Sequence, residues 1–451
     1  MRKVVVFVLA SLFPLFLLFL AVANPPSVQA VPSYARQTGL ACSGCHYTPP
    51  ELNPAGRRFK LLGYVDKKDK GITDDSAKHH TGLDLLGSLP VSVMFETSFT
   101  NTNAPQPATQ NGNFEFPQDF SLFLSGAWTT HVGSFFQVTY HTTDDHFTSD
   151  NTDIRYANTN KFAGKDLVYG LNLNNNPGVE DLWNDTPAWG FPWILSDVAP
   201  LPTATPIING PLAQDVAGLG AYAMWDSHLY VDSALYRSEH VGVSQPNPGT
   251  KPINIRGVAP YWRVAWQQST PTTQFEVGTY GIHLDSTPFN ITGLKNDYTD
   301  WAVDSQLDRT LFRRDVLSLR GTFIGEHSSL YASAAAMPPA ANLIKHHLDT
   351  VMANAEYHFG NRFSGTVGFF DTWGTGDMAL YSQAPISGSA NGDPKSNGYI
   401  ANVSFWPIQN IQLAFQYTGY TRFNGGGTNY DGAGRNANGN NTVYLLARFI
   451  F

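Results

Sequence analysis

The chain has 451 residues and a formal net charge of −8, with 13% aromatic and only 14% charged residues. An acidic chain is a poor binder of nucleic acid, because nucleic-acid recognition depends on basic surfaces. The charged fraction lies well below the roughly 25% of ordinary soluble domains. After residue 30 no apolar run is long enough for a transmembrane helix. This composition is typical of transmembrane β-barrels, which place apolar residues at every second position of each strand.

Residues 1–30 have the pattern of a secretory signal peptide. A short basic start is followed by a largely apolar run from Val4 to Val22, and small residues precede a cleavage site expected after Ala30. The alternative is a membrane-anchor helix, because the run approaches spanning length. The small-residue site favours cleavage, so the sequence predicts an exported protein.

The strongest motif follows at Cys42-Ser43-Gly44-Cys45-His46. Two thiols spaced C-x-x-C with a histidine directly after them are the attachment signal for c-type haem. Cys42 and Cys45 are predicted to bond the porphyrin covalently, with His46 as the proximal iron ligand. A thioredoxin-like motif would need a βαβ pattern nearby, which the following prolines oppose. A zinc site would need two more close ligands, and the chain has no other cysteine. We therefore expect one c-type haem as cofactor.

The rest of residues 31–81 offers little material for a core. A short helix is expected after Asn53, a suitable N-cap, with Pro54 at the first helical position. About fifty residues is small for an independent core, especially one that must cover a porphyrin. We expect this segment to pack against something larger.

From residue 82 onward the apolar pattern has period two, which indicates β-strands. Near the C-terminus, for example, Ile411, Leu413, Phe415 and Tyr417 alternate with smaller or polar residues. Sixteen such segments are predicted, at 83–99, 117–129, 134–145, 151–162, 166–175, 214–225, 228–238, 257–267, 273–284, 299–311, 314–328, 347–359, 362–373, 397–406, 410–422 and 441–451. The last ends on an aromatic residue, as outer-membrane proteins typically do.

The connections between these segments alternate in length. Those after even-numbered segments are tight, whereas most of those after odd-numbered segments are long and polar, including 100–116, 176–213, 239–256, 374–396 and 423–440. Short periplasmic turns and long outer loops are the arrangement of outer-membrane barrels, and a sandwich or propeller does not need it. We predict an all-β, sixteen-stranded antiparallel transmembrane β-barrel over 82–451, in the bacterial outer membrane, with a small, partly helical haem plug at 31–81.

Residues 33–64 carry a more specific likeness. Ala35-Arg36-Gln37-Thr38-Gly39, the C-x-x-C-H motif, the run 52–60 and Gly63-Tyr64 resemble the fused monohaem cytochrome–porins of the outer membrane, whose characterised members oxidise iron(II) at the cell surface. The family order is a signal peptide, one C-x-x-C-H, a short cytochrome segment and a sixteen-stranded porin, and all four parts are expected here. The resemblance implies haem attachment at Cys42 and Cys45, proximal ligation by His46, and an iron(II) oxidase that passes single electrons to a periplasmic cytochrome c or copper protein.

No motif marks the second axial ligand of the haem iron. The strand alternation directs Met94, Met224 and Met352 into the lumen, and His79 and His80 lie at the end of the plug. These five residues are the candidates. A methionine would raise the haem potential, which suits acceptance of electrons from iron(II).

Charged side chains are expected in the lumen. Arg57, Arg58 and Lys60 are candidates to pair with the haem propionates, with a solvated helix face as the alternative. Lumen-facing residues of both signs suit plug docking or a polar channel wall; they are Glu96, Arg155, Arg263, Asp304, Arg320, Glu326, Glu356 and Arg448.

The long connection 176–213 contains Glu180, Asp181 and Asp185, which would attract metal cations. These carboxylates lack any tight ligand spacing, so a folded cap rich in turns is the better expectation.

Three functions fit these features. The first is oxidation of extracellular Fe(II) at the haem, with transfer of the electron to a periplasmic carrier. The second keeps the architecture but uses another electron donor or the opposite direction. The third is a diffusion porin whose cytochrome segment is not catalytic.

Overall fold

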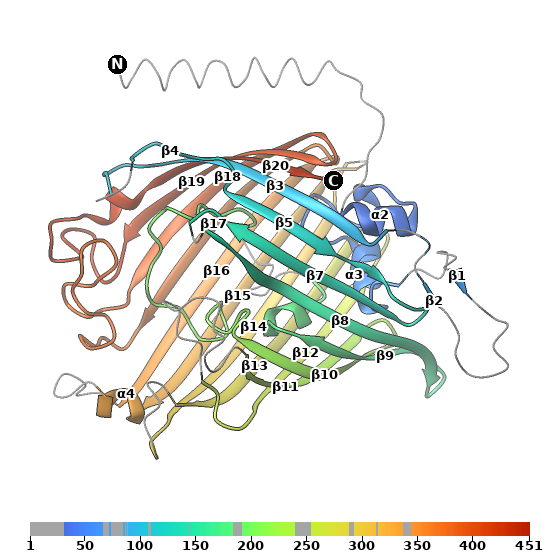
Figure 1. The fold of residues 1–451 in the computed structure, drawn as a ribbon, viewed down its shortest axis with the longest axis horizontal. Helices are drawn as coiled ribbons and strands as arrows, with labels where there is room; N and C mark the ends of the chain where they lie inside the picture. Colours follow the sequence, from blue (N-terminus) through green and yellow to red (C-terminus); the bar gives the residue numbers. More distant parts are fainter. Residues whose placement is uncertain are drawn as a thin grey trace.

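The computed structural model describes residues 31–65, 72–73, 84–85, 87, 89–106, 110–143, 145–183, 192–239, 254–287, 293–312, 314–336 and 344–451. The expected signal peptide at 1–30, and both His79 and His80, lie outside these residues. The described chain forms one closed antiparallel barrel, with short helices inside one of its ends (Figure 1).

The barrel closes in sequence order, and its last strand pairs with its first. The strands are β3 (Val91–Thr102), β4 (Asn113–Glu115), β5 (Asp119–Leu124), β6 (Gly126–Ala127), β7 (Val132–His141), β8 (His146–Phe162), β9 (Lys165–Asn174), β10 (Val216–Trp225), β11 (Leu229–Ser238), β12 (Ala259–Ser269), β13 (Thr273–Ser286), β14 (Asn296–Thr310), β15 (Val316–Leu330), β16 (Lys345–Phe359), β17 (Phe363–Gly374), β18 (Ser396–Ile408), β19 (Ile411–Arg422) and β20 (Thr442–Ile450). β4, β5 and β6 are successive pieces of one strand between β3 and β7, so the barrel has sixteen strands.

The predicted fold class is confirmed, and each of the sixteen predicted segments overlaps a barrel strand. The largest difference concerns the first segment, because β3 begins at Val91 rather than residue 83. Pro90 directly precedes β3 and has no N–H to give to a strand ladder. The earlier residues instead supply β2 (Asp84–Leu85), which pairs with β1 (Ile72–Thr73) in a separate two-stranded sheet.

The two faces of the strands differ in polarity. On β12, Trp262, Val264 and Trp266 are exposed on the outside, whereas Tyr261 and Arg263 are buried in the lumen. Contiguous exposed apolar surface marks contact with a partner or with lipid. A closed barrel with an apolar exterior and a polar interior is an outer-membrane barrel, and the predicted bacterial outer-membrane location is confirmed. Among the described residues, no helix is both long and apolar enough to span a membrane.

Tight turns gather at one end of the barrel, which we call the turn side. The two-residue turn after β8 has positive φ at Ala163 (51°) and Gly164 (78°), and the turn after β10 has positive φ at Asp226 (52°) and Ser227 (59°). The C-terminal Phe451 exchanges backbone hydrogen bonds of 2.8 Å with Val93 at this same end. The turn side is therefore the periplasmic side, and the opposite, loop side faces outward.

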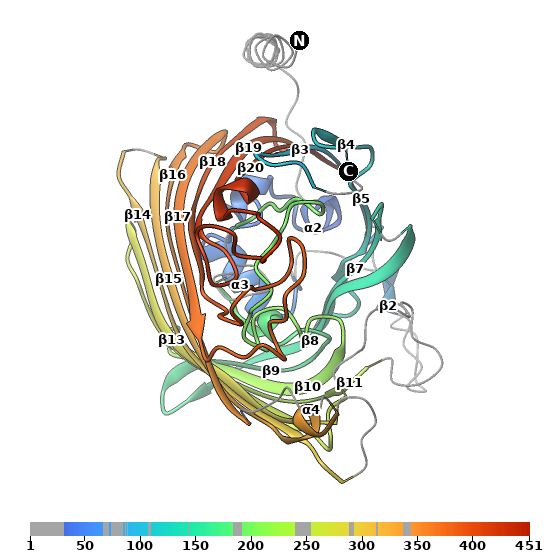
Figure 2. The ribbon, with the colours of Figure 1, turned by 90° about the vertical axis from the view of Figure 1, so that its left-hand side faces the viewer.

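The plug occupies the turn side of the lumen. It contains α2 (Pro32–Thr38), the single-turn helix η1 (Cys42–Gly44) and α3 (Pro54–Leu61). Figure 2, viewed along the barrel, shows α2 and α3 within the ring of strands. The loop-side connections contain η2 (Pro177–Glu180), α4 (Tyr331–Ala336) and η4 (Ala437–Asn440). As predicted, Asn53 caps α3, accepting hydrogen bonds from the Ala55 and Gly56 amides.

Candidate functional site

The C-x-x-C-H motif forms one tight turn against the barrel wall. The amides of Cys45 and His46 both donate to the Cys42 carbonyl, at 3.0 and 2.9 Å. The Cys42 amide donates to Oε1 of Gln409 at 2.7 Å, in the turn between β18 and β19. The two cysteines form no disulfide. The motif is therefore placed at the periplasmic mouth, with both thiols on one turn of chain.

His46 has one ring nitrogen engaged by the plug backbone. Its Nδ1 lies 3.2 Å from the carbonyl oxygen of Glu51. A carbonyl oxygen can only accept, so this contact is a hydrogen bond when Nδ1 carries the proton. That tautomer leaves the lone pair of Nε2 for a metal, as histidine ligands require. Burial lowers the pKa of His46, which keeps the ring neutral.

A cavity of about 360 Å³ opens beside the motif, within the size range of cofactor sites. All three motif side chains line it. Phe59, Tyr64, Phe123 and Phe135 form an apolar cluster along its wall. Burial also raises the pKa of the Cys42 thiol to about 12. Two neighbouring thiols, an oriented neutral imidazole and an apolar cavity fit a covalently attached haem, although the cofactor itself stays a prediction.

Of the five predicted distal ligands, the described structure brings Met94 to this cavity. Met94 lies on β3 and packs against the apolar cluster. Met224 lies in a different cluster, beside a second cavity. Met352 packs against a third cluster, formed by strands farther around the barrel. The remaining candidates, His79 and His80, lie outside the described residues.

The three basic residues proposed to pair with the haem propionates lie in different places. Lys60 lines the cavity, and its Nζ donates to the Asp181 carbonyl at 2.5 Å. Arg57 pairs with a buried aspartate of β14 and does not line the cavity. Arg58 lies beside the second cavity, of about 560 Å³. Arg448, expected only as a lumen charge, also lines the cavity beside the C-x-x-C-H motif.

Glu51 joins the plug to the barrel wall. Its carboxylate contacts Arg320 of β15, lies 3.0 Å from Nε2 of His358 on β16, and accepts the Ser318 hydroxyl at 2.9 Å. Burial opposes ionisation, but the charges of Arg320 and His358 outweigh it and lower the pKa of Glu51. Because the Glu51 carbonyl also contacts His46 Nδ1, one residue connects the expected iron ligand with two strands.

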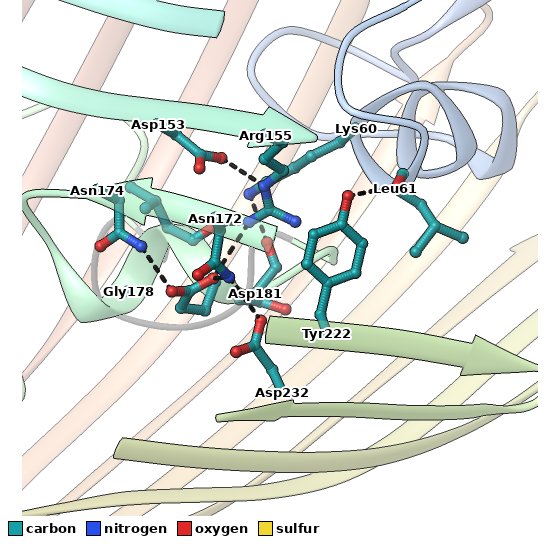
Figure 3. Close-up of polar contacts among 12 residues, drawn as sticks. Lys60, Leu61, Asp153, Arg155, Asn172, Asn174, Gly178, Asp181, Tyr222 and Asp232 are labelled. Atoms are coloured by element: carbon teal, nitrogen blue, oxygen red, sulfur yellow. Dashed lines mark hydrogen bonds and ion pairs between the residues drawn. The ribbon is translucent and has the colours of Figure 1, made fainter. Parts of the chain in front are cut away.

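A second set of contacts holds the end of α3 (Figure 3). Arg155 on β8 is fully buried, and its Nε donates to Asp153 at 2.7 Å. The Tyr64 hydroxyl donates to the same carboxylate at 2.6 Å. From β10, the Tyr222 hydroxyl donates to the Leu61 carbonyl at 3.0 Å. Asp153 and Tyr222 of the barrel wall thus hold the end of the plug, and Arg155, one of the predicted lumen charges, fixes the Asp153 carboxylate.

Connection 176–213 is folded, as expected, but its described residues enter the lumen instead of covering the mouth (Figure 2). Glu180 and Asp181 are fully buried and bonded to the wall: Glu180 accepts from Asn174 at 2.5 Å, and Asp181 pairs with Arg263 at 3.3 Å. These carboxylates hold the loop in place. Asp185 lies outside the described residues.

We call the described residues of connection 176–213 the lumen loop, and this loop also contacts β16, β19 and β20. The Trp193 indole donates to Glu356 of β16 at 3.1 Å, and Ile194 packs with lumen residues of β19 and β20. Pro192 and Trp193 also line the cavity beside the C-x-x-C-H motif. The loop and the plug together narrow the lumen around that cavity.

Substitution of Gly56 with alanine is expected to displace the motif. A Cβ at Gly56 would lie 2.2 Å from the Cys45 carbonyl oxygen, so α3 could not keep its approach to the haem-attachment turn. Overpacking of this kind costs about 1–3 kcal/mol. Limited proteolysis in detergent should cleave the plug faster in this variant. Gly365→Ala is the control, because a Cβ there meets no atom within 4 Å. Equal cleavage of both variants would contradict the expected crowding.

Comparison with solved structures finds other barrels. The outer membrane channel DcaP of Acinetobacter baumannii has 13% identity, a TM-score of 0.46, and coverage of 80% of this chain and 96% of its own. OmpT of Vibrio cholerae has 10% identity, a TM-score of 0.43, and coverage of 86% and 100%. OmpF of Salmonella typhi, in complex with daunomycin, has 10% identity, a TM-score of 0.45, and coverage of 80% and 97%. No protein-family model matches the chain, and no curated protein matches it.

Proposed function

We propose that this outer-membrane barrel transfers single electrons across the membrane, oxidising extracellular Fe(II) at a c-type haem and delivering the electron to a periplasmic cytochrome c or copper protein. The observation that carries the proposal is the C-x-x-C-H turn, with His46 oriented by Glu51, in the wall of an apolar cavity inside the barrel. The haem, when bound, supplies a one-electron couple at this position.

The protein's own residues hold, orient and shield the cofactor. Cys42 and Cys45 would attach it, and His46 would ligate iron through Nε2. The aromatic cluster along the cavity excludes water, while Lys60 and Arg448 offer positive charge to propionates. The Gln409 contact keeps the motif at the periplasmic mouth, where a soluble carrier can approach.

A diffusion porin is the second candidate, and the barrel itself favours it. The cavity of about 560 Å³ lies between α3 and the turn-side strands, lined partly by Thr159, Asn160 and Gln274. Water and small solutes could occupy such a polar space. On this alternative the cytochrome segment only narrows the pore.

Stopped-flow mixing of the purified protein with Fe(II) tests the proposal. Rapid growth of the reduced haem band supports iron(II) oxidation, whereas a band that reduces with dithionite alone removes Fe(II) as the donor. Rapid swelling of protein-containing liposomes in sugars, together with no response to Fe(II), would favour the porin.

Met94→Ala is expected to change the haem spectrum and to lower the reduction potential. Of the three methionine candidates, Met94 lines the cavity beside the C-x-x-C-H motif, and a methionine ligand raises the potential of a haem. Met224→Ala is the matched control, since Met224 lines the other cavity. Redox titration followed by optical spectroscopy measures both effects. An unchanged spectrum in Met94→Ala would exclude Met94 as the sixth ligand.

A further inference from the structure

Three side chains of metal-binding types converge between the loop side and the cavity beside the C-x-x-C-H motif. They are Asp119 of β5, His141 of β7 and Asp197 of the lumen loop, and one ligand atom from each lies within 4.8 Å of the others. Nδ1 of His141 lies 2.7 Å from Oδ1 of Asp119. Nε2 of the Gln118 side chain donates to Oδ1 of Asp197 at 3.2 Å, which holds this loop carboxylate in position. The side chains of Asp119 and His141 are partly accessible, and Asp197 is exposed.

The surroundings add negative charge. Glu115 and Asp150 both lie close enough to interact electrostatically with this group. The nearby cation, Arg448, is engaged by Glu96. Two carboxylates and one imidazole form a mixed oxygen and nitrogen donor set, which suits iron(II), manganese(II) or zinc(II). A divalent cation would offset the excess of acidic groups.

The cluster is connected with the cavity beside the C-x-x-C-H motif through Glu96. The Glu96 carboxyl interacts with both Asp119 and Arg448, and Arg448 lines the cavity. Met94, which lines the cavity, lies two residues before Glu96 on β3 and on the same lumen face, and two residues of a strand span about 7 Å. A cation bound at Asp119 would therefore lie close to the cavity, on its loop side.

We propose that Asp119, His141 and Asp197 form a site that binds a divalent iron ion while the ion gives up its electron. The identity of the ion as Fe(II) rests on the proposed function. On giving up one electron the bound Fe(II) would become Fe(III), and a haem held by Cys42, Cys45 and His46 would supply the one-electron acceptor. An oxidised periplasmic one-electron carrier would then take that electron. The iron(III) product is released on the outer side of the plug.

Manganese(II), which does not reduce haem, is the probe for the site itself. Titration of the purified full-length protein, followed by the electron paramagnetic resonance of free Mn(II), should show at least a tenfold weaker affinity in His141→Gln and in Asp119→Asn. His283→Gln is the matched control, because His283, Asp285 and Asp297 form a similar cluster elsewhere. Its affinity for the lumen ion should equal that of the wild type. A heat-modified gel shift confirms that each barrel is folded.

Stopped-flow reduction separates the site from the function. The Fe(II) concentration for half-maximal haem reduction should rise at least tenfold in His141→Gln, with dithionite reduction unchanged. Equal Mn(II) affinity in wild type and both site variants would overturn the site, even if Fe(II) still reduced the haem. Loss of Mn(II) binding in the variants, with no Fe(II) response in the wild type, would leave a divalent cation site and remove iron(II) oxidation.

Discussion

The double substitution Cys42→Ser, Cys45→Ser is expected to reduce covalent haem from one per chain to none. Serine hydroxyls cannot form the thioether bonds by which c-type haem is attached at C-x-x-C-H. The barrel should still close, because the motif contributes no strand to its ladder. Haem staining of the denatured protein measures attachment, and the heat-modified gel shift measures barrel folding.

Ser43→Ala is the control for this experiment, because it changes the same turn without removing a thiol. It should retain the full haem content. Covalent haem in the double variant, or none in the wild type, would show the cofactor prediction to be wrong.

Arg320→Met is expected to cost about 3–5 kcal/mol in the free energy of unfolding, because removal of one partner leaves a buried charge uncompensated. Arg320 contacts Glu51 of the plug and lies 3.3 Å from Glu356 on β16, and both carboxylates are buried. The plug should undock before the barrel opens. Denaturant unfolding in detergent gives the free energy, and protease cleavage within residues 31–65 reports undocking.

Two further variants sharpen this test. Adding Glu51→Gln to Arg320→Met should recover part of the loss, since the double variant no longer buries the unpaired Glu51 charge. Lys165→Ala removes an exposed pair with Asp226 on the turn side and should leave stability unchanged. If Arg320→Met behaves like Lys165→Ala, the ion pair does not hold the plug.

The sequence by itself determined the barrel and the haem-attachment motif. A strand that separates lipid from a polar lumen must alternate residue by residue, so the pattern of Tyr261 to Trp266 is visible without tertiary contacts. The lengths of turns and loops were also visible in the sequence, because each can be counted between two neighbouring strand segments. C-x-x-C-H could be recognised because its spacing lies within a single turn of chain. The start of β3 was missed where Pro90 interrupted an otherwise apolar run.

Only the tertiary structure decided which distant residues meet. Met94, Met224 and Met352 share the same alternation, and strand position around the barrel separates them into different clusters. Entry of 176–213 into the lumen brings Asp197 to Asp119 and His141, although nothing in their local sequence predicts it. Residue periodicity specifies which face a side chain takes, whereas convergence depends on strand stagger, barrel curvature and the course of a long loop, and these arise from pairings far apart in the chain.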